Sequence, residues 1–304
     1  MRLISPFLRK LRRPHIWRRI FNERLTEPLH VNAASVFVAI LGTLRGRIAH
    51  DLIIRPHNAY SILQAADWAK SQGVRVISLV EFGVAAGAGL MNMAHIAAKV
   101  TRATGIEFKI YGFDTGRGMP PPVDFRDHPD LYHTGDFPMD ERALRAALPN
   151  NVTLLIGDVA QTVPEFLKQV SSSAPIGYVV FDLDYYSSTQ VALAVLKDPD
   201  PSKYLPLTIT FFDDMHHPRH NQWCGEFLAI EDFNSSNPTR KIGQDAFLAD
   251  RRIYRRSEWI KQMFFLHVLD SPLRRTSDLS TRQVLENPYL TRMTDVKAAK
   301  KADA

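Results

Sequence analysis

Five apolar segments of this 304-residue chain each end in an acidic residue, a type that accepts hydrogen bonds from hydroxyls and ligates hard cations. These acids are Glu81, Asp114, Asp158, Asp182 with Asp184, and Asp213 with Asp214. The first is followed at once by a glycine-rich stretch, in which Gly83, Gly87 and Gly89 let the backbone approach a ligand closely. The pattern predicts a cofactor loop beside a set of carboxylates.

The glycine spacing argues against a dinucleotide as the cofactor. A dinucleotide loop needs G-x-G-x-x-G, whereas Gly87-Ala-Gly89 is followed by Leu-Met-Asn, so the third glycine is missing. Glu81, two residues before the first glycine, favours a cofactor with a cationic amino group. Asp114, at the end of the next apolar segment, is suited to accept hydrogen bonds from ribose hydroxyls.

A parallel sheet would bring these acids together. The strand candidates, most of them separated by helical periodicity, are residues 75–82, 107–114, 151–158, 176–184, 207–214 and 262–269. Ligands of open parallel sheets bind outside the carboxyl ends of the strands, so the acidic ends are expected to converge. We therefore predict an α/β fold with a Rossmann-like, doubly wound, mostly parallel sheet, helices on both faces and an N-terminal helical extension.

The sequence divides into an N-terminal arm and helix (1–54), a main domain (55–290) and a flexible tail (291–304). Within the main domain, residues 115–150 form a long connection with a short helix near its end. Connections of this length in compact domains are usually functional, so we predict that this cover segment lies over the site.

The net charge of +6 belongs to residues 1–24, which hold eight basic residues and one acid and leave 30 basic and 31 acidic residues elsewhere. We therefore expect no nucleic-acid partner. The basic, amphipathic arm fits either peripheral contact with a membrane or a solvated extension that packs on a partner. The apolar run at 31–42 is too short to span a bilayer and is predicted to pack on the domain or over its site.

The chain has one cysteine, Cys224, so an intrachain disulfide is excluded. A cytoplasmic location is the simpler expectation, with peripheral membrane attachment as the variant that the arm suggests. A homo-oligomer is left open.

Five motifs, in order, carry a resemblance to a known family: EFGVAAGAG, YGFDTGRGMP, IGDVAQTVPEF, FDLDYYSSTQVAL and FFDD. Together they resemble class I S-adenosylmethionine-dependent methyltransferases of the macrocin O-methyltransferase (TylF/MycF) type, over roughly residues 55–235. The resemblance implies an O-methyltransferase that uses S-adenosylmethionine and Mg²⁺ or another divalent metal. The implied acceptor is a hydroxyl of a sugar, a glycolipid or another small molecule.

The resemblance also implies roles for individual residues. The cofactor's methionine end would meet Glu81, Gly83 and Gly87, its ribose Asp114, and its adenine Asp158 and Val159. The metal carboxylates would be Asp182, Asp213 and Asp214, with Asp184 as an alternative ligand, and Asp182 is also predicted to be catalytic. A histidine is a suitable general base at neutral pH, and His133 is ranked before His216 and His217.

Two other interpretations remain open. Asp182-Leu-Asp184 also fits the D-x-D motif of metal-dependent glycosyltransferases, although that class does not need Glu81 and its glycine loop. A nonenzymatic binding protein that uses this fold and its basic arm at a membrane is the other alternative.

Overall fold

The computed structural model describes residues 17, 20–216 and 221–272. Most of the basic arm, His217 and the predicted tail at 291–304 lie outside the described residues. The described residues up to Ser271 belong to one compact unit. The predicted domain boundaries at residues 54 and 290 stay predictions.

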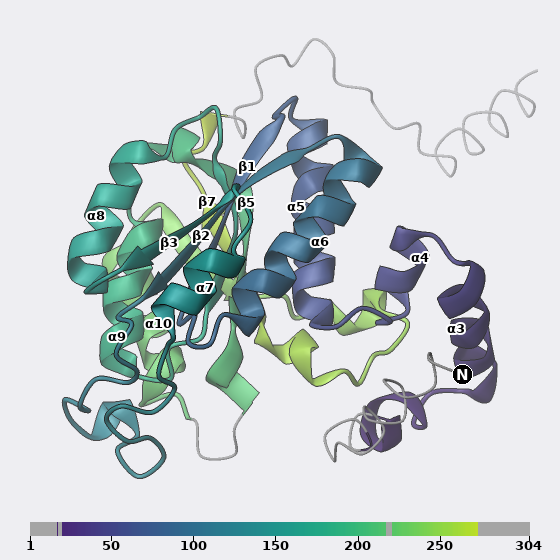
Figure 1. The fold of residues 1–304 in the computed structure, drawn as a ribbon, viewed down its shortest axis with the longest axis horizontal. Helices are drawn as coiled ribbons and strands as arrows, with labels where there is room; N and C mark the ends of the chain where they lie inside the picture. Colours follow the sequence, from purple (N-terminus) through teal and green to yellow (C-terminus); the bar gives the residue numbers. More distant parts are fainter. Residues whose placement is uncertain (1–16, 18–19, 217–220, 273–304) are drawn as a thin grey trace, which may run out of the picture. The chain divides into compact units, whose positions relative to one another are not determined.

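A seven-stranded sheet lies at the centre of this unit, in the order β3-β2-β1-β4-β5-β7-β6 (Figure 1). The strands are β1 (Val76–Phe82), β2 (Glu107–Asp114), β3 (Val152–Ile156), β4 (Ile176–Phe181), β5 (Tyr204–Phe212), β6 (Arg240–Gln244) and β7 (Met263–Val268). Strands β1 to β5 are parallel, while β7 is antiparallel to β5 and β6. The predicted mostly parallel, doubly wound sheet is confirmed, and its strand order reverses between β1 and β4.

Alternating side chains along the strands build a separate core on each face of the sheet. The main helices are α5 (Pro56–Ser71), α6 (Ala88–Thr104), α8 (Val159–Gln169), α9 (Tyr186–Ala192) and α10 (Gly225–Ser236). Ile77 and Leu79 of β1 belong to the core beneath α5 and α6, whereas Val80 and Phe82 belong to the core beneath α8, α9 and α10. Each fully buried side chain of this kind contributes about 1.5–3 kcal/mol to stability.

The N-terminal extension is helical, as predicted, with α3 (Leu29–Leu41) and α4 (Leu44–Ala49) before the main domain. Helix α3 corresponds to the apolar run predicted at 31–42. It is hydrogen-bonded to Tyr254, near the end of the described chain, through Ser35. No helix in the described part of the chain is long and apolar enough to cross a bilayer.

Candidate functional site

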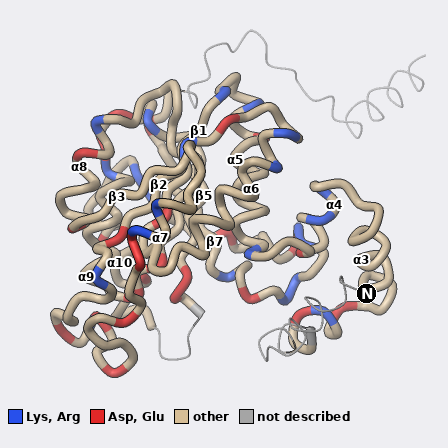
Figure 2. The backbone as a smooth tube through the Cα atoms, in the orientation of Figure 1, with Lys and Arg blue, Asp and Glu red and all other residues tan. Residues whose placement is uncertain are grey.

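The carboxyl ends of the parallel strands open onto a cavity of about 1410 Å³. Its lining includes the acids of four strand ends, Asp114, Asp158, Asp182, Asp184, Asp213 and Asp214. Figure 2 shows acidic positions in red on the loops beside α9 and α10. The sheet therefore brings the predicted acids of β2 to β5 to one site.

The glycine loop joins β1 to α6 and is packed tightly against the protein itself. Gly83 has a φ of +83°, and a Cβ there would lie 1.7 Å from the carbonyl oxygen of Asp182. A Cβ on Gly89 would lie 1.8 Å from Oε1 of Glu81, and one on Gly87 would lie 2.3 Å from Leu144 Cδ1. Glycine is thus needed at these positions because β1, the end of β4 and α7 (Glu141–Ala147) pack closely against the loop. The expected reason was close contact with a ligand.

Glu81 is 2% exposed, and its Oε2 atom has no hydrogen-bond partner among the described residues. Burial raises the pKa of this carboxyl to about 8, while the charge of Arg55 acts in the opposite direction. The nearby charges of Asp213 and Asp114 raise the pKa further. A buried polar atom without a partner is costly, so a cationic group bound beside it would be stabilised.

Asp114 and Asp158 use part of their hydrogen-bonding capacity to shape the cavity. Asp114 accepts hydrogen bonds from the backbone N–H groups of Ala85 (2.8 Å) and Gly116 (2.7 Å), which fixes the glycine loop against the end of β2. Asp158 accepts one from Ala160 (2.8 Å) as the N-cap of α8. Each carboxylate oxygen has a second lone pair, so both residues can still accept bonds from a ligand. Val159 also lines the cavity.

Two residues that we did not predict complete the acidic side of the site. Tyr132, from the cover segment, donates a hydrogen bond to Oδ1 of Asp214 (3.3 Å), and the backbone N–H of Asp184 donates to Oδ2 (3.1 Å). The backbone N–H of Asp214 donates to Oε2 of Glu226 (3.1 Å), which is 1% exposed in the first turn of α10. The sequence signal for Glu226 is its helical spacing from the apolar residues Ala229, Ile230 and Phe233, with which it shares the buried face of α10.

Burial raises the pKa of Asp182, Asp214 and Glu226 well above the usual range. Neighbouring carboxylates add to this effect, led by Asp213 for Asp182 and by Glu226 for Asp214. Burial therefore favours the protonated forms of these groups more than in exposed carboxyls, and a positive charge among them would favour the ionised forms.

The four predicted metal ligands, Asp182, Asp184, Asp213 and Asp214, line the same cavity. Their oxygen atoms are the donors that Mg²⁺ prefers. Within residues 17, 20–216 and 221–272, however, no group of three or more His, Cys, Asp or Glu side chains is placed to hold a metal ion. The donor chemistry fits a hard cation and the arrangement of the side chains does not, so the metal site stays a prediction.

The candidate histidines are less closely associated with the cavity. The His133 side chain is 82% exposed, with its Nδ1 atom 3.8 Å from Oδ2 of Asp136. Its neighbours Tyr132 and Thr134 line the cavity, whereas His133 does not. His216 is the last residue of the 3₁₀ helix Asp213–His216. The assignment of the general base stays a prediction.

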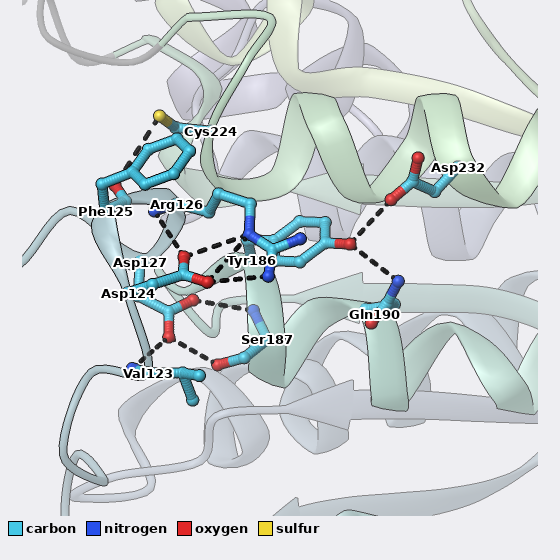
Figure 3. Close-up of polar contacts among 10 residues, drawn as sticks. All are labelled: Val123, Asp124, Phe125, Arg126, Asp127, Tyr186, Ser187, Gln190, Cys224 and Asp232. Carbon is cyan, nitrogen blue, oxygen red and sulfur yellow. Dashed lines mark hydrogen bonds and ion pairs between the residues drawn. The ribbon is translucent and has the colours of Figure 1, made fainter.

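The cover segment is held over the cavity by a buried carboxylate (Figure 3). Asp127 is fully buried and accepts hydrogen bonds from the backbone N–H and the hydroxyl of Ser187, both at 2.8 Å. It also accepts one from the N–H of Val123 (2.8 Å). Two of these bonds also satisfy the start of α9. Tyr185 occupies the cap position without a side-chain bond, and Asp127 takes the role from another segment.

A second set of contacts ties the cover segment to α9 and α10. The guanidinium of Arg126 lies 4.4 Å from the ring centroid of Tyr186. The Tyr186 hydroxyl donates to Asp232 of α10 (2.7 Å) and accepts from Gln190 (2.8 Å), as Figure 3 shows. Met119, Pro120 and Pro121 of the segment line the cavity, as predicted for a cover.

No protein-family model matches the chain, and no curated protein matches it. Among solved structures, it is similar to the calicheamicin methyltransferase CalS11, with 22% identity over 59% of this chain and 70% of that one and a TM-score of 0.44. A second is CmcI with SAH (S-adenosylhomocysteine), with 16% identity, coverage of 67% and 76%, and a TM-score of 0.33.

A third is the MycE methyltransferase of mycinamycin biosynthesis, in complex with Mg, SAH and mycinamycin VI. Its identity is 11%, with coverage of 68% of this chain and 54% of that one and a TM-score of 0.34. Two of these three structures are described as methyltransferases. At such identities and TM-scores the similarity does not assign an activity to this chain.

Proposed function

We propose that this protein is an S-adenosylmethionine-dependent O-methyltransferase that acts on a hydroxyl of a sugar-containing or other small molecule. The observation that carries the proposal is the cavity lined by Asp114 and Asp158, together with the buried Glu81 on the neighbouring strand β1. Glu81 does not itself line the cavity, and its Oε2 atom has no hydrogen-bond partner among the described residues. These acids end or follow β1, β2 and β3, three neighbouring strands. They offer an acceptor for an ammonium group, one for ribose hydroxyls and one for an adenine amino group.

In this proposal Glu81 holds the amino group of the cofactor, Asp114 the ribose, and Asp158 with Val159 the adenine. The bound cofactor supplies a methyl group on a sulfonium, which an acceptor oxygen takes as the carbon–sulfur bond breaks. The cover segment limits the access of water, and the residues that line the cavity orient the acceptor.

The acceptor hydroxyl must also lose a proton. Asp182 lines the cavity, and its raised pKa makes its ionised carboxylate a stronger base than an exposed aspartate. In this proposal a carboxylate oxygen of Asp182, and not His133, accepts the proton from the hydroxyl. The His133 imidazole is exposed and does not line the cavity.

Dependence on a divalent cation is a separate part of the proposal. The oxygen donors of Asp182, Asp184, Asp213 and Asp214 support it by their chemistry and not by their arrangement, so no step of the reaction is assigned to the cation.

The reaction is tested with cofactor that carries an isotopically labelled methyl group, incubated with the protein and a small-molecule extract and analysed by mass spectrometry. We expect the label in an acceptor hydroxyl, and a loss of at least about tenfold in rate for Asp182→Asn. A parallel reaction with EDTA tests whether the rate depends on a divalent cation. Equal rates with and without EDTA would exclude that dependence and would not contradict methyl transfer. No labelled product from any acceptor class, or label on nitrogen or carbon only, would contradict O-methyl transfer.

A further inference from the structure

Helix α3 turns two polar residues, Asn32 and Ser35, toward the protein. Ser35 is the buried residue of this helix, and its hydroxyl is hydrogen-bonded to the Tyr254 hydroxyl (2.6 Å) and to Nδ1 of His50 (2.8 Å). The side-chain amide of Asn32, on the same side, accepts a bond from Tyr254 (3.3 Å) and donates one to the carbonyl of Arg24 (2.8 Å). These bonds fix the rotation of the helix about its axis.

Most of the large apolar residues of α3 consequently face outward. Five large apolar side chains are 63% to 79% exposed, namely Leu29, Val36, Phe37, Ile40 and Leu41. The apolar residues Trp17, Phe21 and Leu25, just before the helix, are 44% to 57% exposed. A surface helix normally shows the opposite pattern, and an exposed apolar surface of this kind marks a site of interaction.

The charge of the neighbouring sequence indicates what covers this surface. Residues 1–24 carry eight basic residues and one acid and lead directly into the exposed apolar stretch. Apolar side chains beside clustered Arg and Lys are what an anionic lipid surface binds. A two-fold dimer pairs a surface with a copy of itself and offers no acidic partner for the positive charge of residues 1–24, whereas anionic lipid does. At about 1.5 Å per residue, the 13 residues of α3 are also too short to cross a bilayer core of about 30 Å.

We infer that α3 and the exposed apolar residues before it bind the surface of an anionic phospholipid bilayer, with the helix axis in the plane of the interface. The inference is independent of the proposed reaction, since none of these residues lines the cavity. It places the apolar side chains among the lipid chains at the headgroup boundary, and the positive charge of residues 1–24 favours anionic headgroups.

The test is co-sedimentation of the full chain with vesicles of phosphatidylglycerol and phosphatidylcholine in equal parts, compared with vesicles of phosphatidylcholine alone. We expect the protein to bind the anionic vesicles with an affinity that falls as the salt concentration is raised. Its affinity for the neutral vesicles should be at least about tenfold lower. The double variant Phe37→Glu, Ile40→Glu should lose at least about tenfold in vesicle affinity. The matched control is Phe247→Glu, because Phe247 is 73% exposed and lies outside the α3 segment.

Circular dichroism establishes that each variant is folded, and Val36→Glu alone replaces the double variant if that protein does not fold. The inference is overturned if the wild type fails to bind anionic vesicles, or if the α3 variants bind as well as the Phe247→Glu control. It is also overturned if the wild type forms a dimer that does not bind vesicles and that the α3 substitutions dissociate, because the occupant would then be a second copy of the chain.

Discussion

Glu81 is buried in the last part of β1, two residues before the glycine loop begins. Its pKa, about 8 in the folded protein because of burial, lies above the ordinary value of 4.5. Between these two values the folded state binds a proton that the unfolded state releases. Stability contributed by the protonated group is therefore complete at low pH and is lost as the pH rises toward 8.

The first prediction concerns stability and pH. From about pH 5 to 8 in the presence of EDTA, the free energy of unfolding should fall as the pH rises, with a contribution from Glu81 of up to ~1.4 kcal/mol per pH unit. Urea unfolding at several pH values measures this slope.

Glu81→Gln should have a shallower slope, because the amide does not titrate. Part of the slope should remain in the variant, since burial raises the pKa of Asp182, Asp214 and Glu226 in the same direction. Identical slopes for the two proteins would show that the Glu81 pKa is not raised.

At the scale of elements, the cover segment and α9 depend on each other. Asp127 accepts three hydrogen bonds in a fully buried position, two of them from Ser187 at the start of α9. Replacement by asparagine leaves fewer acceptor sites and adds two donors. At least one backbone N–H, that of Val123 or that of Ser187, then loses its partner.

Asp127→Asn should therefore lower the free energy of unfolding by roughly 1–3 kcal/mol and expose the cover segment to trypsin at Arg117 or Arg126. Asp124→Asn is the matched control, because the Asp124 carboxylate pairs with Arg126 in a solvent-exposed position and should have little effect on either measurement. Equal trypsin sensitivity of the two variants would show that Asp127 does not hold the segment in place.

Part of the fold and part of the candidate site were predictable from the sequence. Strand β1, its glycine loop and the acidic strand ends were predictable, because apolar runs and the geometry of parallel sheets determine them locally. Glu226, Tyr132 and Asp127 were not, because each reaches the site through a contact with a segment distant in the sequence. The short edge strand β6 was missed as well, since Arg-Lys-Ile-Gly-Gln has little of the apolar alternation that indicates a strand.

At the scale of the whole molecule, two functions are assigned to different parts of the chain. The cavity at the carboxyl ends of β1 to β5 is proposed to bind cofactor and acceptor, and the outward face of α3 is proposed to bind lipid. The apolar surface of α3 contributes no residue to the cavity. Membrane-bound and free protein should therefore bind S-adenosylhomocysteine, the product formed from the cofactor, with the same affinity. Calorimetry with and without anionic vesicles measures the two affinities. A change of tenfold or more, about 1.4 kcal/mol, would show that the two sites are coupled.

The most direct test of the central claim is isothermal titration calorimetry of the full chain with S-adenosylhomocysteine near pH 7, in two buffers of different ionisation enthalpy. We predict binding with release of about one proton, because Glu81 is protonated in the free protein and ionises beside the ligand's ammonium group. Glu81→Gln should bind at least about tenfold more weakly and release no proton, whereas Glu226→Gln, a change at another buried acid, should bind normally. No heat of binding to the wild-type chain, or equal affinity and proton release in Glu81→Gln, would contradict the account.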